Sequence, residues 1–495
     1  MKVKKALSMV LLMALLANTM LSCSESAVQE DPAAVTQDTT VQNSVEEETM
    51  EETETTRIPT GLPESDFEGY TFNIIYEKVN RYQEVDVDEM NGEIINDAVF
   101  QRNSAVETQY NVVIEGIEDA AASSAIQSAV KAGDDTYDIT MVTALTTASL
   151  ATAGVLLDIN TVPNIDLSKP WYDQYANAAI SLGNKQHMFV GDLNIRDNDS
   201  TYLLMFNQKL ATEMGITNLY DMAREGTWTM DALITILSDT AMDLNGDGVQ
   251  NEYDRWGLLG EAWNTNVFIA GTGEYVFLKD ENDLPYVAMG SERYYDAFAK
   301  AFSINGNREY AFIVDDYSAK YGDGVWQERN KIFAEDRSLF FCGIVGSLKD
   351  FREMVTDFGI MPIPKYDEAQ EQYHSILTLG QTTAIAVPMS ATNLDRTGIV
   401  VEALSAEGYY VLTPAYYDNA VTTKYARDDT FTEILDMIFS ARIFELGLLY
   451  NWGGLFYLPS QLTASNQTDL SSKLAANIKG AEKQAQRTLT ALGIE

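Results

Sequence analysis

The chain has 495 residues and a formal net charge of −41 at pH 7, because 74 acidic residues outweigh 33 lysines and arginines. Nucleic acid and anionic lipid surfaces need a basic face, so they are poor partners for so acidic a chain. Hydrophobic residues make up 46% of the sequence, which is enough to build two lobes.

The first 23 residues have the layout of a bacterial lipoprotein signal. Three lysines within the first five residues precede an apolar run over 6–20, and Cys23 directly follows Ser22. The run is shorter than the roughly 20 residues that a membrane-spanning helix needs, so we expect a cleaved signal peptide over 1–22; an uncleaved anchor is the alternative. Lipid such as palmitate on Cys23 would then hold the protein at the extracellular face of the cell membrane, or on the periplasmic side in a Gram-negative cell.

Residues 23–62 are predicted to form a lipidated cysteine followed by a disordered acidic tether. The segment is rich in glutamate and threonine and has almost no aromatic residue, so it cannot bury enough apolar surface to offset the entropy of ordering. A flexible segment of this length spans roughly 35 Å, and more where like charges repel. A folded acidic module is the alternative.

Strand-like and helix-like runs alternate beyond the tether. Strand composition at 70–76, 111–114 and 137–142 is separated by helical periodicity from Ile94 to Tyr110 and over 121–132. This alternation predicts an α/β fold with a parallel sheet and right-handed crossovers. Further strands are predicted at 201–206, 339–345 and 381–387, and further helices at 208–214, 229–238, 292–302, 325–333, 400–407, 431–444 and 470–489.

Residues 243–254 have the spacing of a calcium-binding loop. Oxygen-bearing side chains occupy positions 1, 3, 5, 9 and 12 of a twelve-residue loop, and Gly248 permits the turn at position 6. The predicted calcium ligands are Asp243, Asn245, Asp247, the carbonyl of Val249, Asn251 (directly or through water) and Asp254. The spacing resembles the loops of dockerin modules, but it occurs once, so we expect a structural calcium site onto which Trp256 packs. An Asx-rich turn without metal is the alternative.

Signatures of catalysis are weak. The chain has two histidines, His187 and His374, and no phosphate-binding lysine motif. Once Cys23 is lipidated only Cys342 remains, so no intrachain disulfide can form. Carboxylate pairs suited to glycoside hydrolysis are uninformative in so acidic a chain. The residues alone therefore leave a carboxylate-based hydrolase open.

Aromatic residues are abundant, with 26 tyrosines, 19 phenylalanines and six tryptophans. Sugars stack their C–H faces on exposed rings, while polar side chains around the edge hold the hydroxyls. Tryptophans beside polar or turn residues are candidates for this role, and they are Trp171, Trp228, Trp263 and Trp452. Trp228, at the start of a predicted helix, is the one we expect in the core.

Several segments, in their order along the chain, resemble one family. They are Phe67-Glu-Gly-Tyr-Thr-Phe, Gln101-Arg-Asn, Lys169-Pro-Trp-Tyr, Val190-Gly-Asp, Phe206-Asn-Gln, Gly226-Thr-Trp-Thr, the loop at 243–254, Asp357-Phe-Gly-Ile-Met-Pro-Ile-Pro-Lys and Thr413-Pro-Ala-Tyr-Tyr-Asp. In this order they resemble the extracellular solute-binding lipoproteins of ABC importers, of the carbohydrate-associated family 1 type found in Gram-positive anaerobes.

The resemblance implies a two-lobed, periplasmic-binding-protein-like fold of type II, with crossing hinge strands at 190–195 and 358–365 and a ligand cleft between the lobes. Lobe 1 would comprise 63–190 and return over 358–412. Lobe 2 would comprise 191–357, which contains the calcium loop, and 413–495, which ends in C-terminal helices. The resemblance also implies that the protein is not an enzyme. The implied function is capture of a small solute by a monomer, an oligosaccharide before a peptide or polyol, and delivery to ABC permease subunits.

Six residues are predicted to line the implied cleft: Tyr82, Trp171, Asp192, Trp263, Asn264 and Trp452. Trp263 is the expected stacking platform, and Asp192, at a crossing, the expected acceptor for a sugar hydroxyl. Two other functional classes remain open. A surface lipoprotein glycan hydrolase would use carboxylates in the same cleft, and a calcium-dependent adhesion or scaffold protein would use the loop and the acidic surface.

Overall fold

The computed structural model describes residues 57–78, 83–421 and 429–494. Every helix and strand described lies within the unit Pro59–Glu495. The predicted signal peptide, Cys23 and most of the predicted tether lie outside the described residues, and so does Tyr82. The expectations for them stay predictions.

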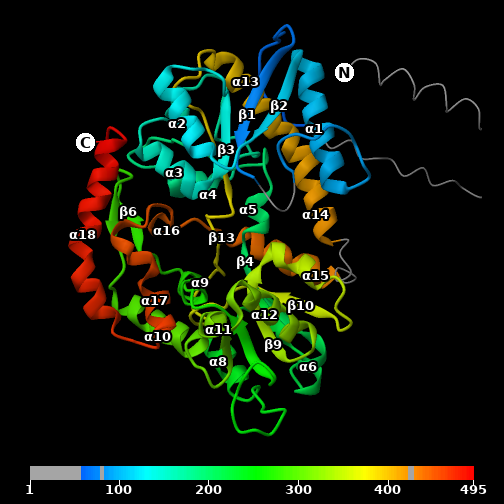
Figure 1. Ribbon diagram of the computed structural model, residues 1–495, viewed down its shortest axis with the longest axis vertical. Coiled ribbons are helices and arrows are strands. Elements are labelled where there is room, and N and C mark those ends of the chain that lie inside the picture. The colour runs from blue at the N-terminus through cyan, green and yellow to red at the C-terminus, as the bar shows by residue number, and fades with distance from the viewer. Residues whose placement is uncertain (1–56, 79–82, 422–428, 495) are drawn as a thin grey trace, which may run out of the picture. The chain divides into compact units, whose positions relative to one another are not determined.

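A four-stranded sheet is formed by β1 (Tyr70–Tyr76), β2 (Val112–Glu118), β3 (Ile139–Thr143) and β12 (Thr383–Ala386), in the order β12-β3-β1-β2. β1 pairs in parallel with β2 and β3, which confirms the predicted parallel arrangement, whereas β12 runs antiparallel to β3. The helices of this part are α1 (Ile94–Tyr110), α2 (Ala122–Ala132), α3 (Ala144–Thr152) and α13 (Leu394–Glu407). α1 and α13 pack against each other beside the strands (Figure 1).

A five-stranded sheet has the order β10-β4-β9-β5-β8, with β4 (Tyr202–Asn207), β5 (Trp256–Gly260), β8 (Ala311–Ile313), β9 (Ser338–Ile344) and β10 (Phe358–Met361). β4 is antiparallel to both of its neighbours, and β9, β5 and β8 are parallel. Every residue of these strands is buried because helices cover the sheet. Those helices include α6 (Gln208–Glu213), α8 (Met230–Ser238), α10 (Glu292–Asn305) and α12 (Val325–Ala334).

The remaining elements are short, apart from α15 (Asp429–Ser440) and the C-terminal α18 (Leu470–Ala491). The helix predicted at 431–444 ends at Ser440, and β13 (Arg442–Ile443) follows it to pair with β11 (Ser375–Ile376). Within the described ranges, no helix is both long and apolar enough to cross a membrane. The other elements are η1 (Ile159–Thr161), α4 (Gln174–Ile180), α5 (Arg196–Asp199), α7 (Leu219–Glu225), α9 (Asn264–Gly271), β6 (Phe277–Lys279), β7 (Pro285–Val287), α11 (Val314–Tyr321), η2 (Gly322–Gly324), η3 (Val345–Phe351), η4 (Gly408–Leu412), α14 (Thr413–Val421), α16 (Leu446–Tyr450), η5 (Trp452–Tyr457) and α17 (Leu458–Ala464).

The chain passes between the two sheets in segments that hydrogen-bond to one another. The first passage enters β4 and includes the predicted crossing at 190–195. The second runs from β10 to β12, and the two meet where Thr201 bridges Leu377 and the Thr378 N–H donates to the Ser200 carbonyl at 3.0 Å. These paired segments tie the two sheets together.

Two predicted lobe boundaries need correction. Residues 358–361 do not return to the first lobe, because they form β10, which pairs with β4 in the five-stranded sheet. The return begins after Met361 and reaches the first sheet at β12. Likewise α14, expected in the second lobe, packs against α1 of the first. Hydrophobic runs mark where strands occur, but they do not say which sheet a strand joins.

Candidate ligand-binding pocket

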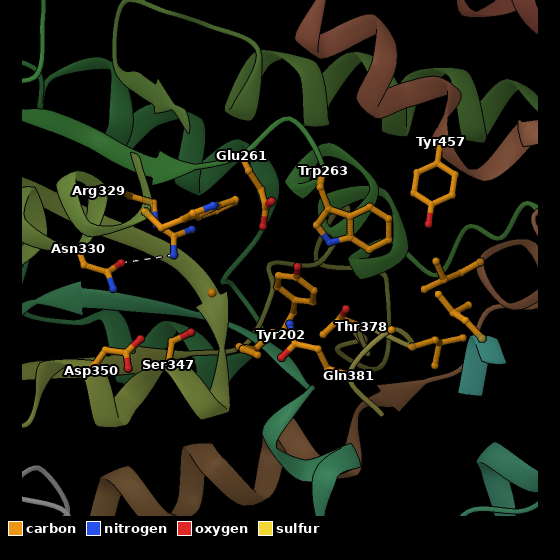
Figure 2. Close-up of a pocket in the computed structure, with 17 residues that line it drawn as sticks. Tyr202, Glu261, Trp263, Arg329, Asn330, Ser347, Asp350, Thr378, Gln381 and Tyr457 are labelled. Atoms are coloured by element: carbon orange, nitrogen blue, oxygen red, sulfur yellow. Dashed lines mark hydrogen bonds between the residues drawn. The ribbon is translucent and has the colours of Figure 1, made fainter. Parts of the chain in front are cut away.

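A cavity of about 610 Å³ lies where elements of the two sheets approach each other (Figure 2). β5 and β9 are parallel, so their carboxyl ends share one edge of the sheet, and Tyr202 at the start of the antiparallel β4 pairs with Ile344 there. Loops at the carboxyl ends of parallel strands are the usual ligand site of α/β sheets. Leu145 at the start of α3 and the loop 378–381 before β12 complete the lining from the first sheet. A ligand in this cavity would contact residues from the four-stranded and from the five-stranded part of the fold.

Aromatic rings are part of the pocket lining. Trp263 packs with its ring centroid 5.2 Å from Phe456, 5.7 Å from Tyr457 and 6.4 Å from Tyr202. Its indole nitrogen is buried and has no hydrogen-bond partner among the described residues. Trp326, on α12, is 40% exposed and also lines the cavity. Rings held this way can offer their faces to a ligand.

The loop that carries Trp263 is fixed by three hydrogen bonds. The amide N–H of Glu261 donates to Asn264 Oδ1 at 2.9 Å, and that of Ala262 donates to Asp315 Oδ2 at 2.8 Å. Asn305 Nδ2 donates to the Glu261 carbonyl at 2.9 Å. Asn264 itself is fully buried. The prediction that Asn264 lines the cleft is therefore wrong, because its side chain turns inward to hold the loop.

Polar side chains line the cavity as well, alongside aliphatic residues and glycines, and they are Glu261, Arg329, Asn330, Ser347, Asp350, Thr378 and Gln381. Figure 2 shows these residues around the cavity, with Arg329 and Trp263 on separate sides of Glu261. Burial lowers the pKa of Arg329 and raises the pKa of Glu261, and the attraction between the two opposes both shifts. Ring faces together with hydroxyl, amide, carboxylate and guanidinium groups can bind a molecule that has both C–H faces and hydroxyls.

Two of the predicted platforms are core residues. Trp171 is fully buried and its Nε1 donates to Glu402 Oε1 at 3.1 Å. Trp452 is 2% exposed, stacks on Tyr450 with centroids 4.9 Å apart, and donates from Nε1 to Thr488 Oγ1 at 2.9 Å. Neither ring can offer a face to a ligand in the pocket, so both predictions are wrong. Of the six predicted residues, the structure places Trp263 in the pocket lining.

Asp192 lies in the first passage and is not part of the pocket lining. Its Oδ1 accepts a hydrogen bond of 2.5 Å from Thr413 Oγ1, which begins α14. Burial raises the pKa of Asp192 to about 7. The side chain predicted to accept a sugar hydroxyl thus links the first passage to the start of α14.

The other two tryptophan predictions agree with the structure. Trp228 is fully buried and donates from Nε1 to the Pro362 carbonyl at 2.9 Å, as expected of a core residue. Trp256 is 3% exposed and donates from Nε1 to the Asn251 carbonyl at 3.0 Å, so it packs onto the predicted calcium loop.

The predicted calcium loop folds around its own side chains. Asp243 accepts from the N–H groups of Gly246 and Gly248 at 2.7 and 2.8 Å, and both glycines have positive φ. Asp254 is fully buried and accepts from Leu244 and Asn251 N–H at 2.9 and 2.8 Å. These bonds fold the loop back on its own carboxylates, while Asp243, Asn245 and Asp247 stay exposed. In the described part of the chain, however, no group of three or more His, Cys, Asp or Glu side chains is gathered to hold a metal ion.

Several pocket residues escaped prediction from the sequence, among them Tyr202, Trp326, Arg329 and Tyr457. One signal was available, because Trp326 and Arg329 are three residues apart in the predicted helix 325–333 and so share a face. Tyr202 had no such signal, since it begins a strand whose residues are buried on both sides.

Solved structures with a similar fold are known. RafE from Streptococcus pneumoniae in its apo form matches with a TM-score of 0.55 at 13% identity, over 84% of this chain and 98% of RafE. A cyclo/maltodextrin-binding protein complexed with maltotetraose matches with a TM-score of 0.54 at 13% identity, over 86% of this chain and 98% of that one. UspC from M. tuberculosis matches with a TM-score of 0.53 at 14% identity, over 84% of this chain and all of UspC. The likeness confirms the predicted two-lobed α/β fold. No protein-family model matches the chain, and no curated protein sequence does.

Proposed function

We propose that this protein captures an oligosaccharide in the pocket around Trp263 and delivers it intact to an ABC permease. The observation that carries the proposal is the composition of the pocket, which combines aromatic rings with hydroxyl, amide, carboxylate and guanidinium groups at the junction of the two sheets. A solute held there contacts both halves of the fold. The likeness in fold to a cyclo/maltodextrin-binding protein complexed with maltotetraose supports this assignment.

The melting temperature of the purified protein tests the proposal against a panel of neutral oligosaccharides, peptides and polyols. A ligand that binds only the folded state at a hundredfold excess over its Kd stabilises it by about 2.7 kcal/mol, which is a visible shift. We expect a selective rise with one class of oligosaccharide, which is recovered uncleaved. Recovery of cleaved glycan would instead indicate a hydrolase, and a flat response would favour an adhesion or scaffold role.

Membrane attachment belongs to the same proposal. In a cell without an outer membrane a binding protein needs an anchor to stay near its permease, and the signal-like sequence before Cys23 provides a means. We expect the mature chain to begin at Cys23 with its acyl chains attached. Mass spectrometry of the N-terminal peptide from membranes of the expressing cell would identify them, and an unmodified or uncleaved N-terminus would contradict the expectation.

We further propose that the loop at 243–254 binds calcium as a structural ion. The curled loop and its carboxylates support this, with Asp243, Asn245, Asp247, Val249, Asn251 and Asp254 as the residues that would hold it. Calcium should raise the melting temperature of the wild-type protein, and the rise should vanish in an Asp243→Ala, Asp247→Ala double variant. Asp280→Ala is the matched control, because Asp280 also accepts backbone N–H bonds in a turn but lies outside the loop. An equal rise in the double variant, or none in the wild type, would exclude the site.

A further inference from the structure

Two oppositely charged side chains line the pocket without pairing. Arg329 is 8% exposed, and its one hydrogen bond to a described residue is a 3.4 Å contact from Nη2 to Asn330 Oδ1, while Nε has no partner. Glu261 is partly buried on the facing loop. Within the described ranges, neither side chain has an oppositely charged group within the 4.0 Å of an ion pair.

The guanidinium is held in place by rings rather than by an acid. Its central carbon lies 4.9 Å from the Trp326 ring and 4.3 Å from the Phe341 ring. Such contacts hold the guanidinium plane and leave its N–H groups available along the edge. Burying a guanidinium with almost no hydrogen-bond acceptor lowers the stability of the folded protein. The described residues do not supply that acceptor, so a bound ligand is the expected source.

The charges around the pair limit what the partner can be. Asp315 and Arg329 act on Glu261, whereas Glu261 and Asp350 are the carboxylates that act on Arg329. A ligand carboxylate beside Arg329 would therefore meet the field of Glu261 and Asp350. A ligand ammonium group beside Glu261 would be repelled by the positive charge of Arg329. A hydroxyl group suits both, because it accepts one hydrogen bond while donating another.

We propose that Glu261 and Arg329 form a divided ion pair that a neutral sugar unit bridges, with its hydroxyl oxygen accepting from Arg329 and a hydroxyl proton donated to Glu261. The pair would make the pocket selective for neutral saccharides over those that carry a uronate or an amino group. This inference rests on the proposed function of the same pocket. It adds that the ligand is uncharged and that Glu261 and Arg329 are the two side chains that determine this selectivity.

The test compares Glu261→Gln and Arg329→Met with the wild type by titration calorimetry. The probes are the neutral oligosaccharide that the panel identifies, an oligogalacturonide as the anionic arm and a chitosan oligosaccharide as the cationic arm. Each substitution should weaken neutral binding about tenfold to hundredfold, as expected for loss of a hydrogen bond to a charged group. The double variant should lose less than the product of the two single losses, because both side chains contact the same sugar unit.

Selectivity should shift in opposite directions in the two variants. Glu261→Gln removes repulsion from the anion, so its preference for the neutral over the anionic probe should fall. Arg329→Met should lower the preference for the neutral over the cationic probe. Glu328→Gln, on the same helix but outside the pocket lining, is the control and should leave all affinities unchanged.

Stability and affinity are measured separately, so that a folding defect is not read as a binding defect. If Arg329→Met does not fold, Arg329→Lys keeps the charge while losing the fork of donors, and it should still weaken neutral binding. Neutral binding that survives both substitutions within twofold, or a wild type that prefers a charged probe, overturns the inference alone. A wild type that binds no saccharide overturns the proposed function and this inference with it.

Discussion

Replacing Trp263 with alanine is expected to weaken oligosaccharide binding about thirtyfold or more, because a tryptophan platform at the centre of a site usually contributes at least about 2 kcal/mol. The ring lies in the pocket lining on a loop fixed by Asn264 and Asp315, so its position should not depend on ligand. Titration calorimetry with the oligosaccharide identified by the melting panel measures the loss.

The same ring also packs on Phe456 and Tyr457, so the substitution will lower the melting temperature as well. Trp452→Phe is a matched control for that effect, because Trp452 is a buried tryptophan that lies outside this pocket and loses its hydrogen bond to Thr488. We expect Trp452→Phe to be destabilised yet to bind with wild-type affinity. Unchanged affinity in a folded Trp263→Ala protein would remove Trp263 from the binding site.

The first part of the fold could be predicted closely from the sequence. The strand predicted at 70–76 has the same bounds as β1, and the predicted helix that ends at Tyr110 is α1. Asn111 ends that helix in the left-handed conformation, with φ of 48°, which asparagine tolerates well. Here alternating strand and helix patterns and local end signals agree with the tertiary structure.

The five-stranded sheet was harder to predict. β8 has three residues and β5 has five, two of them glycines, and both are buried on each face. Short strands buried on both faces lack the alternation of apolar and polar residues that marks a half-exposed strand. β10 was assigned to the wrong lobe for a related reason, since its pairing with β4 depends on contacts distant in sequence.

The site was only partly predictable because local context does not determine which way a side chain points. Trp171, Trp263 and Trp452 all stand beside polar or turn residues, yet only Trp263 lines the pocket. The other two find buried acceptors for their indole N–H groups. Arg329 was missed for the opposite reason, because an arginine in an amphipathic helix normally lies on the solvent-facing side.

Replacing Arg442 with methionine is expected to reduce the free energy of unfolding by about 3–5 kcal/mol, the usual cost of removing one partner from a buried ion pair. Arg442 Nη1 donates to Asp197 Oδ2 at 2.6 Å and to Asn198 Oδ1 at 2.7 Å, and Nη2 donates to Asp173 Oδ2 at 3.2 Å. The side chains of Asp197 and Asp173 are only 7% and 15% exposed. Among the described residues Arg442 is the cation that pairs with each of these carboxylates, so its removal leaves both without that partner.

The location of Arg442 adds to this effect. It begins β13, Asp197 belongs to α5 in the first passage, and Asp173 caps α4 by accepting from the Ala176 N–H at 2.8 Å. One guanidinium therefore holds together three segments that are distant in sequence, next to where the chain passes between the sheets. Arg224→Met is the matched control, because Arg224 also pairs with two acids but is 36% exposed and should cost at most about 1 kcal/mol.

The loss of unfolding free energy in Arg442→Met should depend on pH. Burial already raises the pKa of Asp197, with Arg442 opposing the rise, and the pKa of Asp192 nearby is about 7. Removing the guanidinium raises the folded-state pKa of Asp197 further above its unfolded value near 3.9. The folded variant then holds protons that the unfolded chain releases, so its stability falls as pH rises from about 4 toward 8.

Urea unfolding of the wild type, Arg442→Met and Arg224→Met at pH 5 and pH 8 measures this dependence. The difference in free energy of unfolding between wild type and Arg442→Met should be larger at pH 8 than at pH 5. The corresponding difference for Arg224→Met should stay small at both pH values. Adding Asp197→Asn to Arg442→Met should reduce the loss of unfolding free energy at pH 8, because the buried carboxylate that lost its partner is then removed. A loss that is independent of pH, or no larger than that of Arg224→Met, would show that Arg442 does not hold these passages together through its charge.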